Sequence, residues 1–533
     1  MTDRGDPGEM SEPTSASKGN APLLPNRFRS TIHLTLMTAA VYLVYLLQGI
    51  CISNYFGTSA ELDGFWLAML VVTTLVALAE PFKEAAVVGV KVQELSDPEE
   101  SQRTFSGLLN RLILWSLAII AAAALAARPL ATFLAPDAAD RAPRAEVFQL
   151  TLFLLPLCLL QATGILIEGY LSVQRKYLVP RFYTLIGVLA AVAVIVQFHH
   201  RLAVMAIVLA FYVQFGVKLA GMIWSLQRGG FRYSLTLGSH GTGGRFVPLL
   251  LVQLSAMFML FLLQKFISAA ASGGLSAYNF AYAVWVVPLM LLASSVATVT
   301  WTDMLEAGHL DVGRLWGEFD FIARLTVAAM FAFSLLFFFL ADPIVRFIYE
   351  RGAFTAASVG LTADCLRVLA FGLPFWGLLS LSVRGLLARR KQMAILCIGI
   401  AQNVIIALSI LLARRFSARI ETLLIPYVGF NIVGSIALTR ALFAGGGGAY
   451  FRRLAGGLAR ITMAVIVVAV GFGLCQRSLP RATELGTPGR LAYLGLAGIG
   501  LLLAYIVILW LVGEKDLLDY LLRKALPARA DRN

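Results

Sequence analysis

Three charged residues close together in an apolar region are the first candidates for chemistry in this chain. Glu80 and Glu84 lie four residues apart and would share one face of a helix, and Lys83 lies three residues after Glu80. Such a face could form the polar wall of a central cavity. Alternatively, the three residues lie at a membrane interface, because residues 62–79 nearly span a bilayer by themselves. The sequence leaves both interpretations open.

Further polar residues fall inside or at the ends of other apolar segments. Such residues are costly in lipid, so each marks a candidate position for binding. These additional candidates are Gln48, Asn54, Asp63, Gln253, Gln264 and Arg384. Asp63 could instead be a first-turn acid of its helix. Other polar residues are better explained by structure: we expect Gln402 and Asn403 to bond between helices, and Asp364 to pair with Arg367.

The motifs of soluble enzymes do not occur in the sequence. We find no phosphate-binding loop, no paired-histidine metal pattern and no nucleophile elbow. The five cysteines are scattered through apolar runs, which favours buried small side chains over disulfides or metal ligands. We therefore predict a protein that is not an enzyme and has no bound cofactor. Any transport would draw on a gradient or on the membrane potential, with Na⁺ or H⁺ as a possible coupling ion.

The elements that position these residues are predicted to be transmembrane helices. The chain has 533 residues and only 14% of them are charged, against about 25% in soluble proteins. We count fourteen apolar segments of spanning length. They are residues 32–52, 62–82, 107–134, 147–170, 178–197, 202–225, 246–269, 277–301, 318–340, 360–386, 392–412, 420–442, 457–475 and 490–513. The predicted fold class is an all-α polytopic membrane protein.

The placement of basic residues predicts the orientation of the chain. With an even number of spans, both termini lie on one side, and the loops on that side hold 28 Lys and Arg against 12 on the other. The positive-inside rule then places both termini in the cytoplasm. The formal net charge of +14 is thus explained by topology and by contact with the lipid bilayer, so nucleic acid is not an expected partner.

A weak internal repeat divides the chain. Gly57-Thr58-Ser59-Ala60 is similar to Gly274-Leu275-Ser276-Ala277, and Pro156 and Pro374 stand at nearly the same offset. Chance similarity between apolar helices is the alternative explanation. The repeat predicts an N-lobe of helices 1–6 (27–228) and a C-lobe of helices 7–12 (229–445), followed by helices 13–14 (446–513). Composition predicts a disordered tail (1–26) and a basic tail (514–533).

Residues 350–391 carry the most specific pattern. The turn Arg351-Gly352-Ala353-Phe354-Thr355 precedes an apolar segment that we expect to break at Gly372-Leu373-Pro374, and the basic sequence RGLLARRK (384–391) follows. This pattern resembles the lipid II flippases, the MurJ/MviN family of the multidrug and oligosaccharidyl-lipid flippase superfamily. YFGTSAELDGFWLA (55–68) and GLSAYNFAYAVWVVP (274–288) are similar to other segments of that family.

The resemblance implies two six-helix lobes in a V around a central cavity, with a groove for a polyprenyl tail at helices 13 and 14. It also implies alternating access, an undecaprenyl-linked lipid as substrate, a place in the bacterial cytoplasmic membrane and a monomer. The chain departs from the family where cavity arginines are expected. Those positions fall on Gln48, on Val76 and Ala77, and on Tyr282 and Ala283. Three functions therefore remain: a flippase for lipid II or a close relative, a flippase for another lipid-linked oligosaccharide such as an exopolysaccharide or O-antigen unit, and an ion-coupled exporter or a scaffold that has lost transport.

Overall fold

The computed structural model describes residues 24–80, 83, 98–134, 144–174, 176–236, 246–293, 312–389, 391–417, 419–476, 487–514 and 516–517. This part of the chain is helical apart from turns and short loops, and it has no strand. Fourteen of its helical segments are long and apolar enough to cross a membrane, and each corresponds to one of the predicted segments. The predicted fold class is confirmed. Most of the predicted first tail (1–26) and last tail (514–533) lies outside the described residues.

The first six spans pack into one bundle, which we call the N-bundle. Helix α8 lies along both α1 and α9, and α7 packs between α4 and α9. The fourth span consists of two helices, α6 and α7, that meet at Pro156. The bounds are α1 (Leu24–Phe56), α2 (Ala60–Ala77), α4 (Pro98–Leu125), α5 (Ala127–Leu134), α6 (Arg144–Leu154), α7 (Leu157–Val173), α8 (Leu178–Leu202) and α9 (Met205–Arg228).

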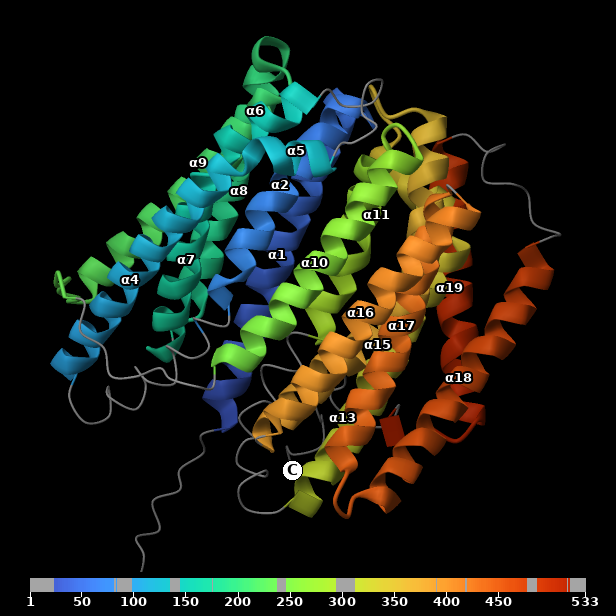
Figure 1. Ribbon diagram of the computed structural model, residues 1–533. Helices are drawn as coiled ribbons and strands as arrows, with labels where there is room; N and C mark the ends of the chain where they lie inside the picture. Colours follow the sequence, from blue (N-terminus) through green and yellow to red (C-terminus); the bar gives the residue numbers. More distant parts are fainter. Residues whose placement is uncertain are drawn as a thin grey trace, which may run out of the picture.

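The next six spans form the C-bundle, around a long helix, α15, that packs against α11, α13 and α17. A π-helical turn, Leu289–Ala293, continues α11. The bounds are α10 (Phe246–Ala270), α11 (Gly274–Pro288), α13 (Val312–Phe339), α14 (Ala341–Tyr349), α15 (Ala356–Ala388), α16 (Gln392–Phe416) and α17 (Ile420–Phe443). The last two spans, α18 (Gly448–Gln476) and α19 (Thr487–Leu511), pack against α13 at the edge of the C-bundle (Figure 1).

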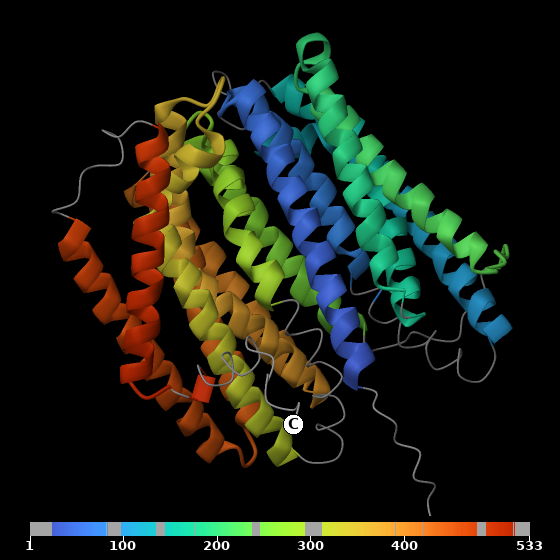
Figure 2. The ribbon, with the colours of Figure 1, turned by 180° about the vertical axis from the view of Figure 1, so that it is seen from behind.

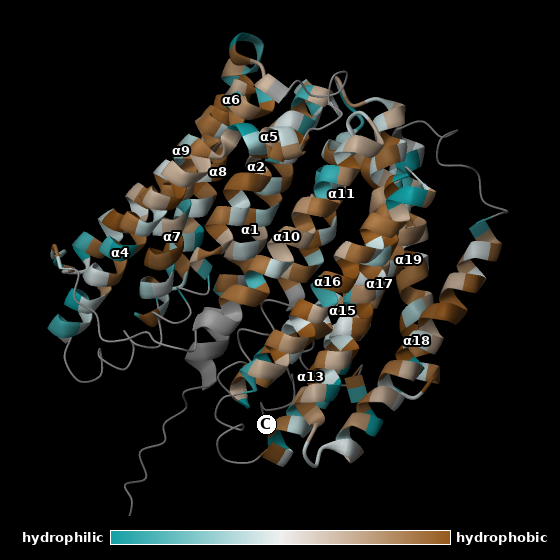
Figure 3. Ribbon diagram, in the orientation of Figure 1, coloured by the Kyte–Doolittle hydropathy of each residue, from teal (hydrophilic) through white to brown (hydrophobic). Residues whose placement is uncertain are grey.

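The two bundles lie closest at one end of the molecule and spread apart toward the other (Figures 1 and 2). The close end holds the start of α2 and the turn before α15. The spread end holds the start of α1 and the end of α19, as an even number of spans requires. Apolar residues cover most of the helices, and polar residues gather mainly at helix ends (Figure 3).

Two details of the predicted helices are wrong. The third span does not continue to residue 134: α4 ends at Leu125, and α5 is a separate helix. Pro129 has no amide hydrogen to donate to the Leu125 carbonyl four residues earlier, so the ladder of α4 stops there. The Gly372-Leu373-Pro374 triplet does not break its span either, because α15 runs from Ala356 to Ala388 with Pro374 inside it.

A neighbouring helix explains why α15 tolerates its proline. Pro374 leaves the carbonyl of Ala370 without its usual partner within the helix. The hydroxyl of Ser334, on α13, donates a 2.7 Å hydrogen bond to that carbonyl. In a membrane interior such a group must be satisfied by protein, and a serine of the adjacent helix is a common donor.

Candidate functional site

The N-bundle and the C-bundle are joined at the close end by a set of polar contacts, which we call the inter-bundle contact. Asp63, on the first turn of α2, accepts hydrogen bonds from the backbone amide and the hydroxyl of Ser276 on α11, at 2.7 and 2.6 Å. Both residues are buried. The hydroxyls of Thr58 and Ser358 lie 2.7 Å apart. The two halves of the predicted repeat therefore meet each other at this end.

The Arg351–Thr355 turn completes the inter-bundle contact. The amide of Ala353 donates to the carbonyl of Asn54, at the end of α1, over 2.9 Å. Gly352 has a φ of +54°, and a Cβ at this position would lie 2.3 Å from the Asn54 carbonyl oxygen, so only glycine fits. Phe354 is buried against the rings of Phe280 and Tyr349. The turn thus locks the end of α1 onto the C-bundle.

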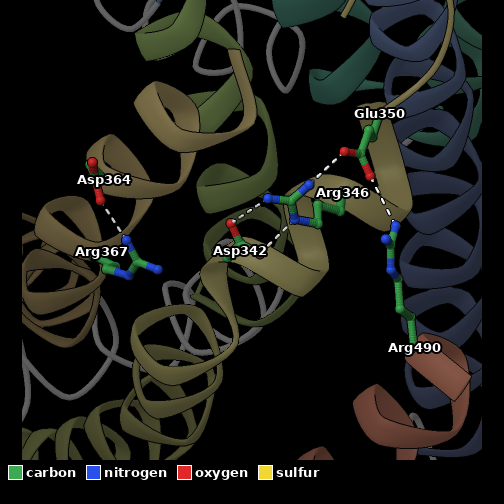
Figure 4. A network of polar contacts seen from close by, with 6 residues as sticks. All are labelled: Asp342, Arg346, Glu350, Asp364, Arg367 and Arg490. Atoms are coloured by element: carbon green, nitrogen blue, oxygen red, sulfur yellow. Dashed lines mark hydrogen bonds and ion pairs between the residues drawn. The ribbon is translucent and has the colours of Figure 1, made fainter. Parts of the chain in front are cut away.

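Ion pairs hold this turn in place on its other side (Figure 4). Arg346, on α14, bonds to Asp342 at 2.7 Å and also to Glu350, immediately before the turn. Arg490, at the start of α19, reaches Glu350 over 3.1 Å. Burial alone would lower the pKa of Arg346, but the Asp342 and Glu350 carboxylates raise it above its ordinary value. Helix α19 is thereby tied to the segment that closes the inter-bundle contact.

Other predicted residues lie apart from that contact. Gln48 is buried on α1 and donates to the side chain of Gln214 on α9 at 3.1 Å. Lys83 pairs with Glu80, whereas Glu84 lies outside the described residues. Gln253 and Gln264 are half-buried on α10, and Arg384 is half-buried near the end of α15. The structure does not gather these residues into one site.

The predicted structural pairs are confirmed. Gln402 donates to Asn431 on α17 at 2.7 Å, and Asn403 donates to Ser255 on α10 at 2.9 Å. Asp364 and Arg367 form a partly exposed ion pair on α15 (Figure 4). Gly372 lies where a Cβ would approach the Trp376 ring at 3.3 Å, which gives it a packing role next to Pro374.

Sequence reasoning missed a charged group inside the N-bundle, which we call the Glu168 cluster. Glu168, on α7, accepts a 3.0 Å hydrogen bond from the ammonium of Lys218 on α9. The guanidinium of Arg181, on α8, lies 3.7 Å from the other carboxylate oxygen. Lys218 and Glu168 are charged residues within apolar spans, and that signal could have identified them. Their proximity could not be read from the chain, since they lie 50 residues apart.

Sequence reasoning missed a second charged group, the Glu514 network, which lies at the edge of the C-bundle where α18 and α19 pack against α13. Glu514, just after α19, is 1% exposed and accepts hydrogen bonds from Arg324 at 2.8 Å and from Arg460 at 2.9 and 2.6 Å. Arg324, on α13, also bonds to buried Asp320 at 2.9 Å. Gly457 leaves room for the Arg324 side chain, because a Cβ there would lie 2.2 Å from it. This network fastens α18 and the end of α19 to α13.

Comparison with known structures agrees with this architecture. The chain resembles a solved structure described as "Lipid II flippase MurJ, inward closed conformation", with a TM-score of 0.67, 17% identity, and coverage of 90% of this chain and 99% of the other. An inward-facing multidrug resistance MATE transporter of the MOP superfamily gives a TM-score of 0.60 and 14% identity, covering 80% and 98% of the two chains. The fold of this chain, with its two helical bundles, is thus similar to the folds of these two proteins.

Sequence comparison identifies the family. The family model described as "Lipid II flippase MurJ" matches residues 52–423, and the chain belongs to this family. It is 22% identical to the lipid II flippase MurJ of Burkholderia cenocepacia over 440 residues, 79% of this chain and 84% of that protein. A probable lipid II flippase MurJ of Rhizobium tropici is 30% identical over 154 residues, 27% and 28% of the two chains. The resemblance noted from the sequence is confirmed.

Proposed function

We propose that this protein moves a polyprenyl-pyrophosphate-linked cell-wall precursor, lipid II or a close relative, across the bacterial cytoplasmic membrane. The family match over residues 52–423 carries this proposal. The inter-bundle contact supports it, because Asp63 and Ser276 join the bundles at one end while the bundles spread at the other. A substrate headgroup would enter at the spread end and leave after the inter-bundle contact has opened.

The proposed cycle uses the N-bundle and the C-bundle as lobes that rock against each other. With both termini in the cytoplasm, the spread end would face the cytoplasm and the Arg351–Thr355 turn would face outward. The inter-bundle contact consists mainly of a few hydrogen bonds, so its donors and acceptors could bond to water instead when the lobes separate. We propose that one polypeptide completes this cycle as a monomer, coupled to a gradient of H⁺ or Na⁺ or to the membrane potential.

We further propose that α18 and α19 hold the polyprenyl tail. Large apolar side chains remain exposed along both helices, including Ile466, Val470 and Leu474 on α18 and Leu496, Ile499 and Leu503 on α19. A polyprenyl chain is as apolar as these side chains and stays within the bilayer while its headgroup crosses. The Glu514 network and the Arg490–Glu350 ion pair hold α19 to the C-bundle at both ends, so the tail would travel with that lobe.

Complementation tests the proposed function directly. A bacterial strain depleted of its own lipid II flippase should regain growth and normal shape when this protein is expressed. Vesicles that contain the purified protein should move lipid II from the inner to the outer leaflet, where an externally added reagent can modify it. If complementation fails while a lipid-linked exopolysaccharide or O-antigen unit is translocated, the substrate class is wrong. If only small cationic drugs are moved, the protein is an exporter.

A further inference from the structure

We propose that the Glu168 cluster is the diphosphate-binding centre of this protein, with Arg181 and Lys218 as its cations. This inference rests on the proposed function and names the residues that would hold the anionic part of the substrate. Two cations share one carboxylate in the cluster, so it carries a net positive charge. All three residues belong to apolar spans, where an uncompensated charge is costly. A bound anion would supply the missing negative charge.

The two cations still have hydrogen-bond donors to offer. Among the described residues, Lys218 donates one hydrogen bond, to Glu168, whereas an ammonium carries three donors. Arg181 makes only the 3.7 Å ion pair within the described part of the chain, although a guanidinium carries five donors. The side chain of Arg181 is 39% exposed and that of Lys218 is 18% exposed. The arginine is therefore the cation that an arriving anion can reach first.

The Lys83–Glu80 pair adds no net charge to this region. Both partners are half-buried just after the end of α2, and the charge of Lys83 acts on Glu168 as well. Counting these five side chains, the cations outnumber the carboxylates by one, and the excess lies with Arg181 and Lys218. A group built only to brace the N-bundle would need one cation for Glu168, and Lys218 already fills that role.

The cluster lies next to α1, the N-bundle helix that contacts α11 of the C-bundle. Gln214 precedes Lys218 by one turn of α9 and shares its helix face, and it donates a 3.3 Å hydrogen bond to the Tyr45 hydroxyl on α1. The side chain of Gln214 also accepts a 3.1 Å hydrogen bond from Gln48 on α1. Arg181 also lies near the start of α8, at the spread end of the molecule (Figure 2). A ligand that enters between the bundles at that end would therefore reach the cluster beside α1.

Diphosphate is the ligand class that these groups fit. A guanidinium binds two phosphate oxygens side by side, and an ammonium adds a compact charge. Glu168 holds both cations in position before the ligand arrives and competes with it afterwards. That competition would keep binding weak enough for release, as a transporter requires.

Binding of inorganic pyrophosphate to the full-length protein in detergent, at low salt, tests this inference. We expect Arg181→Gln and Lys218→Met each to weaken binding about tenfold, a typical loss for one charge-assisted contact. Each variant leaves Glu168 with one cation, so both should fold. Glu168→Gln should instead bind more tightly, because it removes the competing carboxylate. Arg228→Gln is the control: Arg228 lies 3.8 Å over the Trp224 ring, also on α9, and its loss should change nothing.

The sign of the Glu168→Gln effect separates binding from bracing. A bracing role predicts lower thermal stability in this variant and no gain in pyrophosphate affinity, and that result would overturn the inference. Absence of pyrophosphate binding by the wild-type protein would overturn it too. Complementation keeps the two proposals distinct. Full growth of cells that express the Arg181→Gln/Lys218→Met double variant would overturn the binding role of the cluster but would still support the flippase function. Pyrophosphate binding that depends on the cluster, in a protein that fails to complement, would support the binding role and overturn the flippase function.

Discussion

Ser276 donates both its backbone amide and its hydroxyl to one carboxylate oxygen of Asp63, and the two residues lie 213 positions apart in the chain. This arrangement joins the first turn of α2 in the N-bundle to the first turn of α11 in the C-bundle. A single carboxylate thus receives two donors from the opposite bundle. Opening this end requires both bonds to break together, which makes Asp63 a suitable element of a gate.

Cross-linking should stop transport if the inter-bundle contact is a gate. The hydroxyls of Thr58 and Ser358 lie 2.7 Å apart on opposite bundles, so cysteines at these positions would be close enough for a disulfide. We expect the Thr58→Cys/Ser358→Cys protein, with its native cysteines replaced, to lose complementation on oxidation and regain it on reduction. Each single cysteine variant is the control. Unchanged transport by fully cross-linked protein would rule out a gate here.

The orientation of the chain predicts which side the Arg351–Thr355 turn faces. Ala357 is exposed near the start of α15. Its replacement would not remove a helix cap, whereas the Thr355 side chain caps this helix. Ala357→Cys, in a background without native cysteines, should react with a membrane-impermeant thiol reagent in intact spheroplasts. Labelling that appears only after lysis would invert the assigned orientation.

The Glu514 network should contribute much more to stability than an exposed ion pair. Glu514→Gln would leave Arg324 and Arg460 without their shared buried carboxylate. We expect a fall of about 3 kcal/mol in the free energy of unfolding. Asp364→Asn removes one partner of a pair whose side chains are 38% and 43% exposed, and should cost less than about 1 kcal/mol. Equal effects on thermal unfolding would contradict the assigned role of the buried network.

Lys83 offers a test of the polar end of α2. Lys83→Ala removes one cation from the region of Glu168 and leaves half-exposed Glu80 to be hydrated. We expect a several-fold loss of lipid II translocation with normal membrane insertion. Lys83→Arg, which keeps the charge, should retain most of the activity. Wild-type transport by the alanine variant would support a position at the membrane interface without a role in binding.

An added arginine would test whether the family's eighth-span site survives in this chain. Ala283 is half-buried on α11, beside Tyr282. If this position borders the substrate, Ala283→Arg should tighten pyrophosphate binding by about tenfold, the effect of one added charge-assisted contact. Met393→Arg, at an exposed position on α16, adds the same charge elsewhere and should have no effect. Equal affinities of Ala283→Arg and the wild-type protein would mean that position 283 does not contact the substrate.

The fourteen spans and the family could be predicted from the sequence alone, because hydropathy and short motifs are local properties. The Asp364–Arg367 pair was predictable for the same reason, since residues three apart on a helix are always neighbours. The continuity of α15 through Pro374 was not, because it depends on Ser334 of another helix. The partners of Asp63, Glu168 and Glu514 also depend on how distant helices are rotated and packed. Those contacts are set by the three-dimensional packing of whole helices, and no local pattern in the sequence encodes them.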